Sequence, residues 1–314
     1  MFQEKEEIRE ASMIVVEELS KSFGRVKALD RVSMMPPKGI SGLIGPNGAG
    51  KTTLIHILAG LIKSDSGSVK VLDMDPWLHR YELMRKTGFL LERPVFPMNI
   101  TGARYILHVV RVKGLKEKEA VEVLRKVNLS NHSERKISGY SAGMKVRLGL
   151  AKAMVGRPEL VVLDEPTANL DPKGRIELLK LIKTMHKDED IGFLISSHVL
   201  PELQKVCSWV CLMDRGRAIE QGFVDDLLGK YASKIYAIRV PKPRELAEAL
   251  SGLNGLKVKL VKDTIYIKGD ISVFRQELLN LILKTGNEIL GFRQLGRSLE
   301  NVFVKALEVK KHGS

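Results

Sequence analysis

The chain has 314 residues, of which 28% are charged, and a formal net charge of +14 at pH 7. This length is too great for one ordinary domain and predicts two. No run of about 18 apolar residues occurs, which excludes a membrane-spanning helix. Residues 1–11 are charged and lack an apolar segment, so we expect a flexible, solvated tail rather than a secretory signal.

The positive charge is distributed unevenly along the chain. Residues 230–314 contain 16 Lys and Arg against 8 Asp and Glu, whereas residues 1–229 contain 35 against 29. A basic C-terminal part is suited to face nucleic acid, anionic lipid headgroups or an acidic protein surface. An ordinary solubilising surface explains the same composition equally well. The charge alone therefore assigns no partner.

The first predicted elements are two strands, at residues 13–19 and 27–35. Both mix polar and apolar residues, which predicts an antiparallel β layer beside whatever follows. Phe23 lies in the turn between them. An exposed aromatic ring at such a place can stack on a nucleobase. Judged without further context, a core position is the better interpretation.

A glycine-rich loop follows the apolar strand at residues 40–44 and precedes a helix at 53–59. Its sequence fits G-x-x-x-x-G-K-[S/T] in full, the pattern whose backbone N–H groups and helix N-terminus hold phosphate. Lys51 is expected to reach the β- and γ-phosphates, and the Thr52 hydroxyl to ligate Mg²⁺. The candidate phosphate-binding residues are Gly45, Pro46, Asn47, Gly48, Ala49, Gly50, Lys51, Thr52 and Thr53.

The next stretch alternates strands and helices before a helical insertion. A strand at residues 69–72, a helix at 77–86 and a short strand at 88–91 lead to Glu92. From there to Ser138 the periodicity is mostly helical, which predicts an insertion over about 93–138.

Two carboxylates end the next apolar strand. A helix with Ser141 as its N-cap precedes the strand at residues 160–163, which runs directly into Asp164 and Glu165. A buried parallel strand delivers Asp164 to the sheet edge where phosphate-bound Mg²⁺ sits. Glu165 is then placed to deprotonate an attacking water. The alternative, acids that merely end a strand, is common for an isolated pair but not downstream of a complete phosphate loop.

A further apolar strand at residues 191–195 ends close to His198, which brings this imidazole to the same sheet edge and within reach of the γ-phosphate. A hairpin over 210–219 and a short helix over 223–229 close this part of the chain.

After residue 230 the pattern changes to β-α-β-β-α-β, the order of ferredoxin-like folds, followed by an amphipathic helix at 298–310. This part carries no catalytic constellation and is interpreted as a binding or regulatory module. Its strands are expected at 234–240, 256–261, 264–268 and 288–292, and its helices at 243–253 and 271–284.

Taken together, residues 12–229 resemble the nucleotide-binding domain of ABC transporters. The phosphate loop carries that family's filler residues, 140–144 occupy the place of its signature motif, 168–171 match its D-loop, and His198 matches its switch histidine. The resemblance implies an α/β P-loop cassette with a mixed sheet, an antiparallel β layer and a helical subdomain. It also implies that Phe23 stacks on adenine, which reverses the interpretation made without context.

The resemblance implies a second copy as well. Ser141 and Gly143 are expected to contact the γ-phosphate of an ATP held by a partner chain, in a head-to-tail homodimer with two nucleotide sites. Lys51, Glu165 and His198 are the expected catalytic residues, with Thr52, Asp164 and Glu92 around Mg²⁺.

The segment 298–303, Ser-Leu-Glu-Asn-Val-Phe, resembles the element that closes the C-terminal extension of ATP-binding subunits of ABC-2 type exporters. That subgroup includes ATPases similar to those for daunorubicin export, sodium efflux and copper-protein maturation. It implies one cassette per chain, a separate membrane permease, and a location at the cytoplasmic face of the plasma membrane. Direct nucleic-acid binding is not expected.

Two departures from the family pattern stand out. Glu92 occupies the place of the Q-loop glutamine, where a carboxylate still contacts Mg²⁺ or water but adds negative charge beside the phosphates. Tyr140, Ala142 and Met144 replace the more common Leu, Gly and Gln of the signature. We expect a working motif, because Ser141 and Gly143 are retained.

Two other classes of function remain open from the residues. One is a soluble ABC ATPase that acts on ribosomes or nucleic-acid complexes, which the basic composition permits. The other is a phosphotransferase that uses the same loop, which leaves the signature and the switch histidine unexplained.

Overall fold

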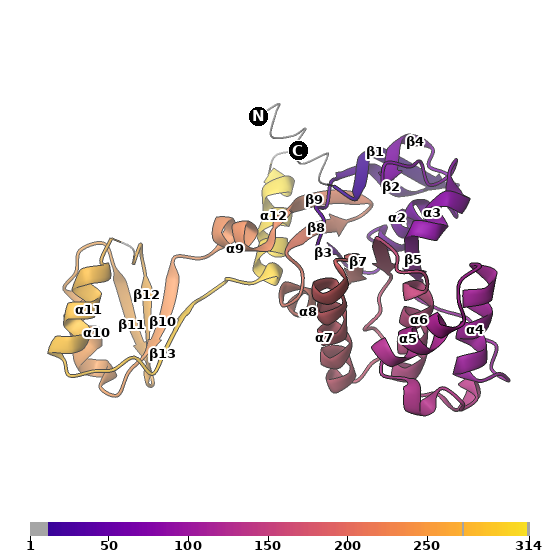
Figure 1. Ribbon diagram of the computed structural model, residues 1–314. Coiled ribbons are helices and arrows are strands. Elements are labelled where there is room, and N and C mark those ends of the chain that lie inside the picture. Colours follow the sequence, from indigo (N-terminus) through magenta and orange to yellow (C-terminus); the bar gives the residue numbers. More distant parts are fainter. Residues whose placement is uncertain (1–11, 272, 313–314) are drawn as a thin grey trace. The chain divides into compact units, whose positions relative to one another are not determined.

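The computed structural model describes residues 12–271 and 273–312 (Figure 1). The chain divides into two compact units, one ending at Val224 and the other starting at Asp225. This boundary lies slightly before the predicted one at residue 229. The difference is that all of α9 (Val224–Tyr231) after its first residue belongs to the second unit. The tail predicted for residues 1–11 lies outside the described residues.

The first unit is built on a six-stranded sheet of order β5-β6-β7-β3-β8-β9. The first five strands are parallel, and β9 pairs antiparallel with β8, which confirms the predicted mixed sheet and its terminal hairpin. The strands are β3 (Ile40–Ile44), β5 (Thr87–Leu90), β6 (Leu160–Leu163), β7 (Gly192–Ser197), β8 (Trp209–Asp214) and β9 (Arg217–Phe223).

A separate three-stranded antiparallel sheet of order β2-β1-β4 confirms the predicted β layer. Its strands are β1 (Ile14–Phe23), β2 (Val26–Met34) and β4 (Ser66–Val71). Strand β4 begins three residues before the predicted start, because Ser66 and Ser68 pair with Ser20 and Glu17 of β1. Buried side chains of this sheet, of α2 and of the six-stranded sheet form one continuous apolar core.

The helices predicted for the first unit are present, but one starts later than predicted, and no helix was predicted at residues 172–189 or 200–204, where the structure has two. Helix α3 begins at Arg80 rather than at Trp77, because the Asp75 carboxylate accepts hydrogen bonds from the N–H groups of Trp77 and Leu78 and holds a turn there. The helices are α2 (Lys51–Leu58), α3 (Arg80–Lys86), α4 (Gly102–Val112), α5 (Lys118–Lys126), α6 (Ala142–Met154), α7 (Pro172–Glu189) and α8 (Leu200–Gln204). Two 3₁₀ turns, Ser130–His132 and Ile137–Gly139, link α5 to α6.

The second unit has the predicted β-α-β-β-α-β order. Its four strands form a fully antiparallel sheet of order β11-β12-β10-β13, which is the ferredoxin-like arrangement. Helices α10 and α11 cover one face of this sheet (Figure 1). The elements are β10 (Ile235–Arg239), α10 (Pro243–Ser251), β11 (Lys257–Val261), β12 (Thr264–Lys268), α11 (Arg275–Lys284), β13 (Gly291–Gln294) and α12 (Leu299–His312).

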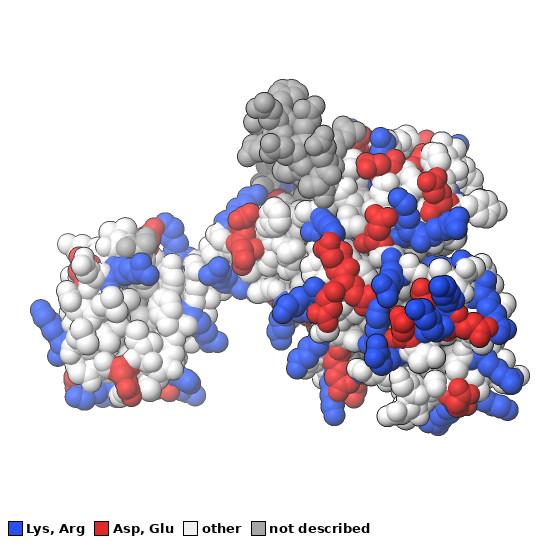
Figure 2. Space-filling view, viewed as in Figure 1, with Lys and Arg blue, Asp and Glu red and all other residues white. Residues whose placement is uncertain are grey.

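Acidic and basic side chains are interleaved over the visible face of the first unit (Figure 2). Over residues 12–271 and 273–312, no helix combines the length and the apolarity needed to cross a bilayer.

Candidate nucleotide-binding site

The order of the central strands brings the predicted site residues together. Strand β7 lies between β3 and β6, and all three run parallel, so their carboxyl ends meet at one edge of the sheet. The phosphate loop follows β3, Asp164 and Glu165 follow β6, and His198 follows β7. The predicted meeting of these residues at one edge is confirmed.

The phosphate loop requires glycine where it passes close to neighbouring backbone. A Cβ on Gly50 would lie 2.5 Å from the carbonyl oxygen of Ala28, and Gly50 also has φ of +100°, which side chains rarely adopt. A Cβ on Gly45 would lie 2.2 Å from the carbonyl oxygen of Met213. The loop then enters α2, whose first-turn N–H groups have no partner within the helix and are available to hold an anion.

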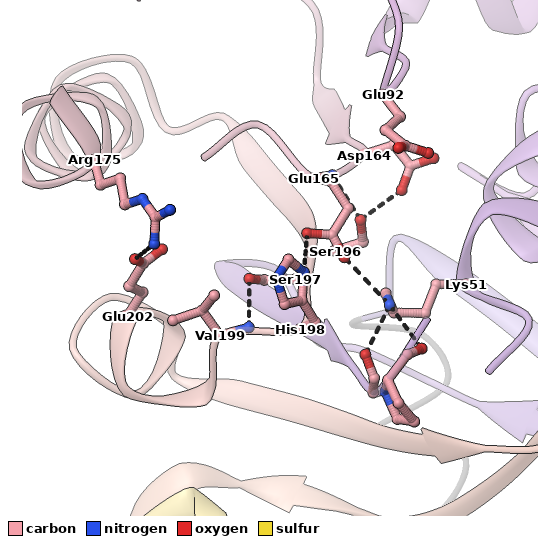
Figure 3. A network of polar contacts seen from close by, with 12 residues as sticks. Lys51, Glu92, Asp164, Glu165, Arg175, Ser196, Ser197, His198, Val199 and Glu202 are labelled. Carbon is pink, nitrogen blue, oxygen red and sulfur yellow. Dashed lines mark hydrogen bonds and ion pairs between the residues drawn. The ribbon is translucent and has the colours of Figure 1, made fainter. Parts of the chain in front are cut away.

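Lys51 is buried and holds three oxygen partners (Figure 3). Its Nζ donates to the carbonyl oxygens of Gly45 at 2.7 Å and Pro46 at 3.2 Å. It also lies 3.2 Å from Oε1 of Glu165. The ammonium is therefore held over the loop by backbone oxygens and neutralised by the carboxylate of the candidate base.

Glu165 connects Lys51 to His198. Its Oε2 lies 2.9 Å from Nδ1 of His198, while its other oxygen faces Lys51. Its backbone is left-handed, with φ of 49°, a conformation that non-glycine residues adopt infrequently and often at functional sites. The carboxylate is thus aimed by two side chains and by a constrained backbone.

Ser196 holds both carboxylate residues, and sequence reasoning gave it no role. Its hydroxyl donates to Oδ1 of Asp164 at 2.6 Å and accepts the backbone N–H of Glu165 at 2.8 Å. Leu163 of β6 pairs with Ile195 of β7, so the next residues, Asp164 and Ser196, lie side by side. Aligning the ends of the two predicted strands would have indicated this contact. Ser196 is fully buried and fixes the end of β6 to the end of β7.

We expect Ser196→Ala to lower turnover by roughly 10- to 100-fold, which corresponds to losing a hydrogen bond to a charged group worth about 1.5–3 kcal/mol. The variant frees the Asp164 carboxylate and releases the N–H of a left-handed residue. Steady-state ATPase assays over a range of Mg²⁺ concentrations measure the effect. A positioning role predicts a fall in kcat together with a higher Mg²⁺ requirement.

Ser197→Ala is the matched control for this prediction. The Ser197 hydroxyl is buried one residue further along the same strand and accepts only the N–H of Val199 among the hydrogen bonds recorded for it in the described chain. Its loss should leave the Mg²⁺ requirement unchanged. Equal effects from both substitutions would assign Ser196 a role in stability alone.

Most of the predicted site residues, but not Gly45, Pro46 or Asp164, line a cleft of about 760 Å³, a volume typical of small-molecule sites. Glu92 lines this cleft, as do His198 and Glu165. Phe23, 48% exposed, is not a core residue, and it does not appear among the described residues that line the cleft. The lining also contains Arg215, which the sequence did not single out. The full lining is Val26, Lys27, Ala28, Asn47, Gly48, Ala49, Gly50, Lys51, Thr52, Thr53, Glu92, Glu165, Ala168, His198 and Arg215.

One wall of the cleft is braced by a charge cluster. Asp30 forms ion pairs with Lys27, which lines the cleft, and with Arg217, whose Nε lies 2.6 Å from Oδ2 of Asp30. The hydrogen bonds from Lys27 and Arg217 hold the pKa of Asp30 below its ordinary value. Asp30 therefore stays ionised and ties β2 to β9.

The oxygen atoms at the sheet edge suit a hard divalent cation. Asp164 is 1% exposed, and its Oδ2 has no hydrogen-bond partner within the described chain, so it is a carboxylate oxygen free to face a cation or its water. Thr52 adds a hydroxyl in the adjacent cleft, and Glu92 a second carboxylate. Across the described residues, no group of three His, Cys, Asp or Glu forms a cation cage. This arrangement fits Mg²⁺, which takes few protein ligands and completes its shell with water and substrate phosphates.

Ser141 and Gly143 lie elsewhere, so one chain does not bring every predicted nucleotide ligand together. Both line a second cleft of about 560 Å³, together with Asn169 and Asp171. Ser141 caps α6 by accepting the N–H of Met144 at 3.3 Å, as predicted, which leaves its own hydroxyl proton to donate.

Tyr140 explains how the unusual signature is accommodated. It is buried, and its hydroxyl donates to the carbonyl oxygen of His132 at 2.8 Å. A Cβ on Gly102 would lie 2.2 Å from that hydroxyl, so the tyrosine fits only because α4 begins with glycine. Burial raises the pKa of Tyr140, which keeps the phenol neutral. The larger residue anchors the signature segment to the helical insertion.

Residues 29–168 match the family described as "ABC transporter". The chain is 33% identical over 310 positions to the bacitracin transport ATP-binding protein BcrA of Bacillus licheniformis, covering 95% of this chain and 98% of that protein. It is 37% identical over 208 positions to the lantibiotic transport ATP-binding protein SrtF of Streptococcus pyogenes, covering 66% of this chain and 89% of that protein.

Solved structures agree with these sequence matches. An ATP-binding subunit of an ABC transporter superposes with a TM-score of 0.63 at 25% identity, covering 70% of this chain and 93% of that one. The protein cbiO1 of Clostridium perfringens, part of the ABC transporter complex cbiONQ, superposes with a TM-score of 0.64 at 25% identity, covering 70% and 92%.

Proposed function

The chain belongs to the ATP-binding subunits of ABC transporters, and on this basis we propose that two copies bind and hydrolyse ATP to power export through a separate membrane permease. The Lys51–Glu165–His198 contacts in the lining of the nucleotide cleft carry the proposal for hydrolysis. The match over nearly its whole length to a bacitracin transport ATP-binding protein supports export. A location at the cytoplasmic face of the plasma membrane follows from such a partner.

In the proposed reaction, Glu165 accepts a proton from the attacking water. His198 contacts Glu165 through Nδ1 at 2.9 Å, which keeps its other ring nitrogen available for the γ-phosphate. Because Lys51 lies 3.2 Å from Glu165, the arriving phosphates take over Lys51 and release the carboxylate for the water. Binding of the substrate thereby prepares the base.

Asp164, Thr52 and Glu92 are the residues that would hold Mg²⁺ beside the phosphates. Bound there, Mg²⁺ supplies positive charge that offsets the charge of the transferring phosphoryl group. Ser196 keeps Asp164 in place for this task through its 2.6 Å hydrogen bond. Phe23, exposed at the end of β1, is proposed to stack on adenine.

We propose a head-to-tail homodimer because the ligands of one nucleotide are divided between two clefts. The phosphate loop lines the first cleft, and Ser141 and Gly143 line the second. A two-fold axis that sets the first cleft of each chain against the second cleft of its partner completes two equivalent sites.

Mixed dimers test this arrangement. Lys51→Ala disables the phosphate loop, and Ser141→Arg disables the signature segment that faces the partner's nucleotide. Each variant alone should therefore be inactive. In a random mixture of the two, half of the dimers have one intact composite site, and we expect roughly a quarter of wild-type activity to return. Phosphate release is measured after the two chains are mixed.

A mixture of Lys51→Ala with Glu165→Gln is the control. Both lesions lie on the same side of the site, so every composite site in a mixed dimer carries one of them. Activity recovered in this control, or none recovered in the first mixture, contradicts the proposed arrangement.

The helical insertion supplies a surface for the permease. A groove of about 350 Å³ lies between the segment after Glu92 and α4, and apolar side chains, including Phe96 and Tyr105, line it. Val95, 91% exposed, lies at this groove. We propose that the permease docks here and that ATP-driven movement passes through Arg93 to Lys113.

Purification of the tagged chain from gently solubilised membranes of its source tests the permease. A stoichiometric partner with several membrane-spanning segments supports the proposal and leads to the cargo. Recovery of the chain from the soluble fraction with ribosomes or nucleic acid would contradict the transport proposal. It would favour a soluble ABC ATPase that acts on ribosomes or nucleic-acid complexes.

A further inference from the structure

The second unit leaves one face of its sheet open. Helices α10 and α11 pack on the face that carries Ile238, Ile265 and Ile267. Neighbouring positions along each strand point to the opposite face, because side chains alternate in a β-strand. The strand register arranges that open face in three rows, which are Lys257–Lys268–Ile235, Lys259–Tyr266–Ala237–Arg293 and Val261–Thr264–Arg239–Gly291.

The charges on this open face all have one sign. None of its eleven described positions is acidic, and five are basic and exposed. In the described parts of the chain, no ion pair involves any of these five, in contrast to Lys234, which pairs with Asp270 at 2.8 Å. The five basic residues are Arg239, Lys257, Lys259, Lys268 and Arg293.

A hollow of about 310 Å³ lies among the two arginines of this face. Its lining consists of Ala237 and Gly291, the two smallest residues in the rows, together with Arg239, Arg293, Thr264 and Phe292. Thr264 donates a 3.4 Å hydrogen bond to Asp263 in the adjacent turn. Guanidinium groups bind phosphate oxygens bidentately, so two of them in a hollow that is also lined by small residues suit one phosphate group.

We propose that this open face docks on an anionic lipid bilayer, with one headgroup phosphate in the hollow and the three lysines over neighbouring headgroups. The basic side chains come from all four strands and form a broad array, which complements the extended negative surface of a bilayer. Each Lys or Arg near such a surface contributes about fivefold to binding, or about 1 kcal/mol.

Single-stranded nucleic acid fits this face less well. Sheet platforms that read RNA stack two or three bases on aromatic side chains of the central strands. Here the central strands present only one aromatic residue on the described open face, Tyr266, and its neighbour across β10 is Ala237. The positive charge is therefore not accompanied by the stacking surface that bases require.

Sedimentation of the full-length protein with vesicles tests this proposal without permease or ATP, so its outcome is separate from that of the proposed function. Binding to vesicles of equimolar phosphatidylglycerol and phosphatidylcholine should exceed binding to phosphatidylcholine alone and should weaken with salt. The double variant Arg239→Ala/Arg293→Ala should lower the partition coefficient about 25-fold, from two losses of about fivefold.

Two control variants separate the hollow from general charge. Arg275→Ala/Lys284→Ala removes the same charge from exposed positions of α11, on the helix-covered side, and should change the partition coefficient by no more than about twofold. Arg239→Lys/Arg293→Lys keeps the charge but loses bidentate geometry, and should bind several-fold more weakly than wild type. ATPase activity in solution should be normal in all three, since none touches the nucleotide cleft.

Four results overturn the proposal. Equal binding to both vesicle types would exclude recognition of anionic lipid. Equal losses of binding in the α11 alanine pair and the Arg239/Arg293 alanine pair would exclude the open face as the binding surface. Wild-type binding by the lysine variant would exclude a specific headgroup-phosphate site in the hollow. Displacement from vesicles by a single-stranded RNA, with RNA binding lost in the Arg239/Arg293 alanine variant, would assign the face to nucleic acid instead.

Discussion

Glu165→Gln should reduce ATP turnover by about 10²- to 10⁴-fold, the usual contribution of a general base. Glutamine keeps the shape of the side chain but does not accept a proton from water. The backbone N–H of residue 165 should still donate to Ser196, and Lys51 keeps the carbonyl oxygens of Gly45 and Pro46. The site should therefore remain formed while the chemical step stops.

The same variant should bind ATP at least as tightly as wild type. In the wild-type chain the Glu165 carboxylate lies 3.2 Å from the Lys51 ammonium and competes with the phosphates for it. The neutral amide of glutamine removes this competition. Dimers formed with ATP should then persist, as size-exclusion chromatography with Mg²⁺ and ATP would detect. Single-turnover phosphate release, measured alongside, separates chemistry from product release.

Glu159→Gln is the matched control. Glu159 immediately precedes β6, at the opposite end of the strand from Glu165, and Glu159 pairs with Lys86 at the surface. Its turnover should equal that of wild type. Normal turnover in Glu165→Gln would remove Glu165 from the role of base.

Lys51→Ala should abolish most activity by a different route. It removes the only ammonium recorded within 4 Å of Glu165 in the described chain and the cation expected over the β- and γ-phosphates. Loss of one preorganised contact to developing charge costs about 10²- to 10³-fold in turnover. ATP affinity should also fall by roughly 10- to 100-fold, because a hydrogen bond to a charged group contributes about 1.5–3 kcal/mol.

Titration with a fluorescent ATP analogue and a phosphate-release assay measure these two effects separately. Lys86→Ala, at an exposed lysine paired with Glu159, serves as control and should alter neither. A Lys51→Ala protein that binds ATP normally would place this lysine outside phosphate recognition.

Although α7 and α8 were not predicted, most of the order of elements could be predicted from the sequence, because most strands and helices have their own periodicity and their own turn residues. The β-α-β-β-α-β order of the second unit is an example, and its sheet order follows from it. Element ends were less predictable where contacts with residues outside the element decide them. Strand β4 starts at Ser66 only because β1 pairs there, and α3 starts late because the Asp75 side chain holds the preceding turn.

The site was predictable where a motif dictates chemistry and less so where geometry does. Lys51, Glu165 and His198 come together as predicted, because strand order places their loops at one edge. Ser196 was missed, since two adjacent serines look alike in sequence and only the pairing of β6 with β7 directs one of them to Asp164. Phe23 is exposed as its proposed role requires, but its ring lies outside the cleft lining described for a single chain.

The segment after β6 has a consequence for cooperativity. Ala168 lines the phosphate-loop cleft, and its neighbour Asn169 lines the cleft that contains Ser141. In the proposed dimer, each chain therefore contacts its own nucleotide and its partner's through adjacent residues. A shift of this segment on binding one ATP alters the affinity at the other site, and by thermodynamic linkage the effect is reciprocal. ATP binding to the dimer should then give a Hill coefficient different from one.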